Sequence, residues 1–220
     1  MLASTRGRFV TFEGIEGAGK STQLGRLRHH LQAQGVNVLV TREPGGTPLG
    51  ERLRALLLDP QVGTMAAETE LLLIFAARAE HLRTVIEPAL ERGLWVLSDR
   101  FTDASFAYQG AGRGLGARRV AALENWLQGD FRPDLVFLFD VPARVGLDRA
   151  LTRGKRDRIE SEDMAFFERA RHAYLERARS DAGRYRVIDA AQDLDSVGLA
   201  MECAWDDWVQ EPANRRGCGE

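Results

Sequence analysis

The chain has 220 residues, 44% of them hydrophobic and 28% charged, a composition that suits one globular domain with a sizeable core. Its net charge of -2 and pI near 6.1 exclude a uniformly basic surface, so we expect no nucleic-acid partner. The longest apolar run, residues 71–77, is too short to cross a bilayer, and no apolar signal segment precedes the first charges, so we expect no membrane partner and a cytoplasmic protein.

The first predicted elements are a strand over residues 9–12, a glycine loop and an amphipathic helix. The loop, residues 14–21, reads GIEGAGKS and has the G-x-x-x-x-G-K-[ST] spacing of a phosphate-binding P-loop. Its glycines let successive backbone N–H groups turn toward phosphate oxygens at a helix N-terminus. Lys20 then reaches the outer phosphates, and the Ser21 hydroxyl can bind the Mg²⁺ of a nucleoside triphosphate. We interpret this segment as a site for ATP or GTP rather than as a glycine turn that binds nothing.

Residues 36–40 form the second predicted strand, and the sequence TREPGGT follows it at residues 41–47. The Pro-Gly-Gly run ends the strand, so Arg42 and Glu43 lie at its carboxyl end, where open α/β sheets bind ligands. An ordinary turn with a solvated charge pair is an equally good interpretation of these residues alone.

Two helices are predicted between residues 47 and 90. The first covers 47–58, and its buried side is expected to hold Leu49, Leu53, Leu56 and Leu57. The second is long, ends at Leu90 and is apolar on several sides, which predicts core or a subunit interface. Arg78 follows its apolar run and either serves a site or, as is commoner, extends along the surface. We expect His81 at the surface or at an interface.

The third predicted strand, residues 94–97, is followed by Asp99 and Arg100. An Asp at the tip of a strand in a P-loop protein can hold Mg²⁺, usually through water, and an adjacent Arg can bind a phosphate bidentately. Residues 102–116 begin with polar and aromatic side chains and end in glycines, which suits either a wall that faces a ligand or a plain loop.

The remaining elements continue the alternation of strands and helices. They are a helix over 117–129, a central strand over 135–139, a helix to residue 152, a helix with aromatic residues, a strand over 185–188 and a last helix to about Gln210. The apolar face of the first of these helices is expected to hold Val120, Leu123, Trp126 and Leu127. The alternation predicts an α/β fold of three layers, in which helices cover both faces of a parallel sheet.

Residues 153–158 contain four basic residues around a glycine. They form either a solvated charge run or a mobile lid that closes over phosphates. We expect a single domain over residues 1–211, with a lid at about 153–160, and a disordered tail over 212–220.

Two features narrow the function to a kinase that acts on a small molecule. The sequence has no asparagine-lysine-x-aspartate element for reading guanine, which disfavours a switch GTPase. Glu16 lies inside the P-loop, where a carboxylate would repel the triphosphate, so we expect it to face the hydroxyl of a second ligand or the water shell of the metal. Such a carboxylate is typical of a site with two substrates.

Six segments together resemble the bacterial thymidylate kinases, a family of P-loop nucleoside monophosphate kinases. They read FEGIEGAGKST, TREPGGT, SDRF, AYQG, GDFRPDL and DRIE, and the resemblance runs from about Arg8 to Trp208. It implies a P-loop NTPase fold with a five-stranded parallel sheet and an Arg-rich lid, usually in a homodimer. It also implies transfer of the γ-phosphoryl group of MgATP to dTMP, which gives dTDP and ADP in dTTP biosynthesis.

The resemblance also assigns individual residues. It implies that ATP contacts Gly14, Ile15, Glu16, Gly17, Ala18, Gly19, Lys20, Ser21, Thr22 and Gln192. For dTMP it implies Glu16 at the sugar 3′-hydroxyl, Arg54 and Arg100 at the phosphate and Arg78 at the base, with further contacts from Glu43, Pro44, Ser105, Tyr108 and Gln109. Catalysis is assigned to Lys20, Arg100 and the lid residues Arg153 and Arg158, and Mg²⁺ to Ser21 and Asp99. The bond before Pro44 is often cis in this family.

One position departs from the family. A Phe usually lies four residues before the Arg that reads the base and stacks on thymine, whereas here that residue is Ile74 and Phe75 follows it. Either a local shift brings Phe75 to the base, or Ile74 packs on the base with weaker and less selective contact.

Two other functions fit parts of the sequence. A deoxynucleoside kinase also has a P-loop and an acidic-arginine element, but its acceptor is a hydroxyl that needs a general base. A regulatory nucleotide-binding module would use the P-loop as a switch and would leave Glu16, Arg100 and the lid without a role.

Overall fold

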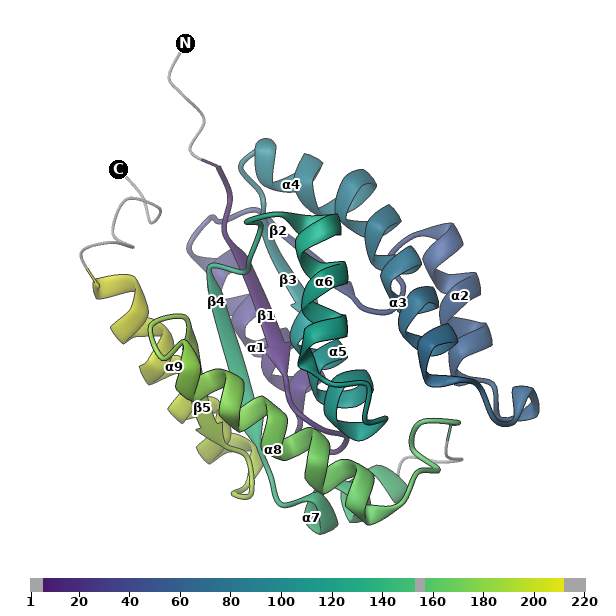
Figure 1. The fold of residues 1–220 in the computed structure, drawn as a ribbon. Helices are drawn as coiled ribbons and strands as arrows, with labels where there is room; N and C mark the ends of the chain where they lie inside the picture. The colour runs from purple at the N-terminus through teal and green to yellow at the C-terminus, as the bar shows by residue number, and fades with distance from the viewer. Residues whose placement is uncertain (1–5, 153–156, 212–220) are drawn as a thin grey trace.

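The computed structural model describes residues 6–152 and 157–211 (Figure 1). Its central element is a parallel sheet of five strands in the order β2-β3-β1-β4-β5. The strands are Phe9–Glu13 (β1), Val38–Arg42 (β2), Trp95–Asp99 (β3), Leu135–Asp140 (β4) and Tyr185–Asp189 (β5). β1 and β4 are almost entirely buried and apolar, as strands covered on both faces must be. The predicted α/β fold is therefore confirmed.

Helices cover both faces of this sheet. Figure 1 shows α8 in front of the strands, with α1 behind them, where it packs on α9 and on β1, β2 and β3. The helices are Lys20–Ala33 (α1), Pro48–Leu58 (α2), Ala67–His81 (α3), Glu87–Glu91 (α4), Thr102–Ser105 (α5), Ala117–Gln128 (α6), Ala143–Leu151 (α7), Met164–Ser180 (α8) and Leu194–Gln210 (α9). None of the helices in these two described ranges has the length and apolarity that crossing a membrane requires.

The long helix expected to end at Leu90 is interrupted. Leu82–Ile86 forms a π-helical turn (η2) between α3 and α4. Pro88, in the first turn of α4, has no N–H to continue an α-helical ladder, so the chain changes its hydrogen-bond pattern just before it. A second π-helical segment, Phe106–Gly112 (η3), continues α5. Of the stretch 102–116, which the sequence left as either a wall or a loop, residues 102–112 are therefore helical and residues 113–116 are not.

Several apolar residues that were expected in the core lie at the surface. Leu49 and Leu56 on α2 are 49% and 44% exposed, and Trp126 on α6 is 82% exposed. Leu72 on α3, which packs against both α2 and α6, is 57% exposed. The predicted burial of Leu49, Leu56 and Trp126 was wrong, because helical periodicity does not distinguish a face that packs inside the chain from one that lies outside it. Helices α2, α3 and α6, of which α3 packs against the other two, thus each expose large apolar side chains.

Candidate active site

The carboxyl ends of the strands border one cavity of about 300 Å³. Its walls come from the P-loop, the ends of β2 and β3, helices α2 and α3, the helical run of α5 and η3, and residues 157–160. Most of the predicted site residues meet there, namely Glu16, Gly17, Gly19, Lys20, Ser21, Thr22, Glu43, Pro44, Arg54, Ile74, Arg78, Asp99, Arg100, Ser105, Tyr108, Gln109 and Arg158.

Other predicted site residues do not border this cavity. Gly14 is absent from its walls, Ile15 and Ala18 point into the main core, and Gln192 is exposed on the loop after β5. Arg153 and the tail over 212–220 lie outside the described residues.

The two candidates for the position near the base are now distinguished. Ile74 borders the cavity, whereas Phe75 is buried with Leu71 and Phe106 in a separate apolar cluster. The predicted shift that would bring Phe75 to the base is therefore absent. The Phe75 ring instead lies 4.6 Å from the Arg78 guanidinium, so it supports that residue from behind.

The P-loop backbone rests directly on the start of α7. Gly17 has a positive φ of 72°, and a Cβ there would lie 1.9 Å from the carbonyl oxygen of Gly146. A Cβ on Gly146 would in turn lie 2.5 Å from the carbonyl oxygen of Glu16. Only glycine fits either position, because a side chain would overlap backbone atoms that have no room to move. The two glycines fix the distance between the P-loop and α7.

Lys20 and Ser21 occupy the start of α1. The Lys20 ammonium donates to the carbonyl oxygens of Gly14 and Ile15, both at 3.0 Å. Burial, with a smaller contribution from the charge of Arg100, lowers the pKa of Lys20 to about 8. The ammonium is thus held inside the loop, where it is already partly dehydrated.

The Ser21 hydroxyl donates to a carboxylate oxygen of Asp99 at 2.9 Å. A hydroxyl and a carboxylate side by side, at the edge of a cavity beside a P-loop, are oxygen donors that suit Mg²⁺ with its remaining ligands from water and phosphate. This donor set fits the ion that the sequence implied, and Ser21 and Asp99 are the residues that would hold it.

Glu16 faces away from the P-loop interior, as its charge predicted. One carboxylate oxygen accepts from Arg100 Nη2 at 2.8 Å, and the other accepts from the Tyr108 hydroxyl at 2.7 Å. The Arg100 guanidinium also lies over the Tyr108 ring, 4.6 Å from its centroid. Burial raises the pKa of Tyr108 well above its usual range, so its hydroxyl remains a donor.

The Arg100 backbone has a conformation that is rare for a residue with a side chain. Its φ is 71°, in the left-handed region. The Arg100 N–H donates to the Phe12 carbonyl at 3.0 Å, and its own carbonyl accepts from the Ser98 hydroxyl at 2.7 Å. These bonds hold the turn after β3, which directs the guanidinium across the cavity to Glu16.

Arg42 and Glu43 form neither a solvated charge pair nor a pair of side chains that both face a ligand. Glu43 is buried and accepts from Arg78 Nε at 2.7 Å, and it contacts His81 Nδ1 at 2.9 Å. Burial opposes ionisation of Glu43, but Arg78 and His81 outweigh it and hold the pKa of the carboxyl below its usual range. Arg42 pairs with Glu51 at the surface.

This cluster corrects the surface interpretations of Arg78 and His81. Both side chains are buried, because they sit one turn apart on the face of α3 that the Glu43 carboxylate covers. His81 Nε2 also lies 2.6 Å from the Thr41 hydroxyl, so the histidine links β2 to α3. The bond between Glu43 and Pro44 is cis, as the family resemblance implied, and the Pro44 carbonyl accepts from Arg54 at 3.0 Å.

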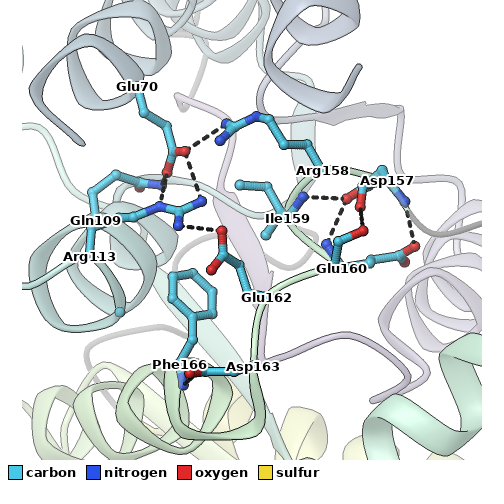
Figure 2. Close-up of polar contacts among 12 residues, drawn as sticks. Glu70, Gln109, Arg113, Asp157, Arg158, Ile159, Glu160, Glu162, Asp163 and Phe166 are labelled. Carbon is cyan, nitrogen blue, oxygen red and sulfur yellow. Dashed lines mark hydrogen bonds and ion pairs between the residues drawn. The ribbon is translucent and has the colours of Figure 1, made fainter. Parts of the chain in front are cut away.

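Sequence reasoning missed Glu70, a fully buried carboxylate in the first turn of α3. Figure 2 shows it at the centre of a polar cluster, where it accepts from Gln109, Arg113 and Arg158. An acidic residue at the start of an apolar helix usually serves the helix N-terminus, which hid this one. The available signal was its spacing, because Glu70 lies one turn before Ile74 and two turns before Arg78, on the face of α3 that borders the cavity.

Arg158, predicted to lie in the lid, is nearly buried in this cluster. Its guanidinium donates to Glu70 at 2.6 Å and to the Leu57 carbonyl at 2.8 Å, and its backbone N–H donates to the Leu58 carbonyl at 3.0 Å. It is therefore held against α2 and α3 at the rim of the cavity, rather than in a solvated charge run.

Glu13, at the end of β1, is a buried carboxyl behind the site. It accepts from the Tyr174 hydroxyl at 2.8 Å and from the Phe101 N–H at 2.7 Å. Burial, followed by the nearby charge of Asp103, raises its pKa to about 8, against the opposing charge of Arg100.

Between about pH 4.5 and pH 8 the unfolded chain loses the Glu13 proton while the folded protein keeps it, so this group makes stability fall as the pH rises. Glu13→Gln lacks this titrating group. On going from pH 5 to pH 8, its free energy of unfolding is expected to rise by about 3 kcal/mol relative to that of the wild type. Chemical denaturation at the two pH values measures this. If Glu13→Gln destabilised the protein equally at pH 5 and at pH 8, the folded protein would hold Glu13 ionised.

One cavity, at the carboxyl edge of a five-stranded parallel sheet, contains both a P-loop and a second, arginine-rich compartment. This arrangement defines a P-loop kinase whose phosphoryl acceptor is a small molecule. The model of the thymidylate kinase family matches residues 12–198. The chain belongs to the thymidylate kinase family and is a phosphotransferase.

Curated relatives and a solved structure agree with this assignment. The thymidylate kinase of Pseudomonas syringae pv. syringae (strain B728a) is 60% identical over 196 residues, which cover 89% of this chain and 93% of the relative. That of Alkalilimnicola ehrlichii (strain ATCC BAA-1101 / DSM 17681 / MLHE-1) is 59% identical over 199 residues, which cover 90% and 92%. The crystal structure of thymidylate kinase from Ehrlichia chaffeensis matches with a TM-score of 0.75 and 33% identity, over 91% of this chain and 99% of that one.

Proposed function

We propose that this enzyme transfers the γ-phosphoryl group of MgATP to dTMP, giving dTDP and ADP, as a step of dTTP synthesis in the cytoplasm. The observation that carries the proposal is the shared cavity, in which the P-loop with Lys20 lies beside Arg100 and Glu16 and opposite the wall formed by Ile74 and Arg78. A donor triphosphate and an acceptor nucleotide can therefore meet in one shared cavity.

The physical difficulty of the reaction is charge. The acceptor phosphate has a second pKa of about 6, so it is largely dianionic at neutral pH and needs no general base. It must nevertheless approach a triphosphate of the same sign. Lys20 and Arg100 supply fixed positive charge at the junction of the two compartments, so they reduce this repulsion and hold the phosphates in line. Mg²⁺ held by Ser21 and Asp99 would neutralise further charge on the phosphates.

The acceptor is proposed to lie across the Glu16 side of the cavity. Glu16 would accept from the sugar 3′-hydroxyl, and Tyr108 fixes the direction of that carboxylate. Arg54 and Arg100 would bind the phosphate, and Arg78 would donate to the base. Arg153 and Arg158 are proposed to act on the phosphates from the lid, which requires Arg158 to leave Glu70.

The test is the release of ADP from MgATP with dTMP, dUMP, dCMP and thymidine offered separately at equal concentration. Turnover with dTMP alone supports the proposal. Turnover with thymidine alone would replace it with a deoxynucleoside kinase, and ADP release that needs no acceptor would indicate a regulatory switch.

Ile74 gives the base a smaller and less specific surface than a stacked aromatic ring would. Replacing Ile74 by Phe is expected to lower the KM for dTMP by roughly two- to tenfold, the usual value of one aromatic stacking contact. The kcat should change little, since the ring lies far from the transferred phosphoryl group. Steady-state kinetics with dTMP and dUMP measure the effect, and a higher KM for both would show that the cavity has no room for the ring.

We also propose that the enzyme works as a homodimer through the apolar face of α2, α3 and α6. Leu72 and Trp126 are strongly exposed on that face, and contact with a second copy would remove them from water. The double variant Leu72→Glu with Trp126→Glu is expected to have half the wild-type mass in light scattering. Leu199→Glu, which charges an equally exposed leucine on α9, is the control and should leave the mass unchanged. A monomeric wild type would contradict the proposal.

A further inference from the structure

Two side chains at the α3 end of the cavity have opposite hydrogen-bonding character. Arg78 can only donate, and its Nη1 atom is buried with no partner among the described residues. Gln109 lies one turn after Ser105, which accepts from Arg78 Nη2 at 3.0 Å, so both side chains border the same part of the cavity. Unlike Arg78, the Gln109 amide could present either its NH₂ group or its oxygen to a ligand.

The neighbours of Gln109 remove this ambiguity. Its Nε2 atom donates to Glu70 Oε1 at 2.8 Å (Figure 2). Glu70 also accepts from Arg113 Nη2 at 3.1 Å and from Arg158 Nη2 at 2.6 Å. Burial opposes ionisation of Glu70, but these three donors outweigh it and hold its pKa below the usual range. An ionised carboxylate is only an acceptor, so the Gln109 amide must turn its NH₂ group toward it.

The Gln109 oxygen is consequently left for a ligand. No donor in residues 6–152 or 157–211 bonds to it, and the side chain borders the cavity. The end wall therefore presents a donor from Arg78 beside an acceptor from Gln109. Thymine offers the complement, since its O4 accepts and its N3–H donates. Cytosine offers the reverse, because its 4-amino group donates and its N3 accepts.

We infer that Glu70 is a positioning residue that sets base specificity by orienting the Gln109 amide, so that the acceptor site selects pyrimidines with a protonated N3. This inference rests on the proposed function and deepens it. It gives Glu70 a part in base selection that acts through the Gln109 amide.

The experiment compares dTMP with 5-methyl-dCMP, which keeps the methyl group, sugar and phosphate and changes only the edge of the base. In Glu70→Gln the residue at position 70 can donate as well as accept, so Gln109 is free to turn. The ratio of kcat/KM for dTMP to that for 5-methyl-dCMP is expected to fall by about tenfold, the value of one buried hydrogen bond. A change that is merely structural would lower both kcat/KM values and keep their ratio.

Two further variants connect the effect to Gln109 and to this site. The double variant Gln109→Ala with Glu70→Gln should have the same ratio as the single variant Gln109→Ala. Glu124→Gln is the matched control, because Glu124 on α6 is also a buried carboxylate paired with an arginine, Arg132 at 3.1 Å, but does not border the cavity. It should keep the wild-type ratio.

If Glu70→Gln does not fold, the double variant Glu70→Gln with Arg113→Gln removes one of the positive charges that had paired with Glu70 and tests the same ratio. If the wild type prefers dTMP and the folded Glu70→Gln variant prefers it to the same degree, the inference is overturned and the proposed function stands. The inference is also overturned if Glu70→Gln still lowers the ratio in the Gln109→Ala background. A wild type that phosphorylates no nucleoside monophosphate would instead remove the proposed function.

Discussion

Replacing Arg100 by Ala is expected to lower kcat/KM for dTMP by roughly 10²- to 10³-fold, the usual cost of removing one preorganised charged donor from an active site. Its guanidinium is the cation that reaches Glu16 from the turn after β3, and it borders the same cavity as the P-loop. The KM for ATP should change much less, because Lys20 and the P-loop backbone remain.

The conservative variant separates charge from geometry. Arg100→Lys keeps a cation but loses the planar fork that binds a phosphate at two points, so it should recover only part of the lost kcat/KM. Arg83→Ala is a suitable control, because Arg83 pairs with Glu87 at the surface and does not border the cavity. If Arg100→Ala changed the KM for ATP alone, Arg100 would belong to the donor compartment.

Replacing Lys20 by Met is expected to lower kcat by about 10³-fold, because Lys20 is the one basic residue in the P-loop sequence, residues 14–21. Met has similar length and is apolar, so the fold should survive. Stopped-flow measurement of phosphoryl transfer, together with binding of a fluorescent ATP analogue, separates loss of chemistry from loss of binding. A kcat within tenfold of the wild type would exclude Lys20 from the transfer step.

The lowered pKa of Lys20 adds a pH dependence to the same residue. In the free enzyme the ammonium is charged below about pH 8 and neutral above it, so kcat/KM for ATP should decline as the pH rises through that value. Lys20→Met should lack this limb of the profile. A wild-type profile that stays flat to pH 10 would show that the free lysine keeps its ordinary pKa.

Local signals in the sequence were enough to predict the sheet and the P-loop. Each strand is a short apolar run, and the glycine spacing of residues 14–21 reports a backbone shape that few other sequences need. The same reasoning placed Glu16, Asp99 and Arg100 in one site, because the carboxyl ends of parallel strands meet at one edge of a sheet.

The rest depended on contacts that no local pattern encodes. His81 looked like a surface residue because nothing nearby in sequence shows that Glu43 will cover it. Glu70 received no prediction because its partners come from residues about 40 and 90 positions further along the chain. Trp126 looked like core because its helical spacing is the same whether the apolar face meets this chain or another.

The contact between Gly17 and Gly146 packs the backbones of the P-loop and α7 directly against each other. Because each glycine faces the backbone of the other segment, α7 cannot move closer to the P-loop at this contact without a collision. The helix ends at Leu151, immediately before the residues assigned to the lid. The lid expected at about 153–160 therefore follows a helix that packs directly on the P-loop, the segment predicted to bind the donor phosphates.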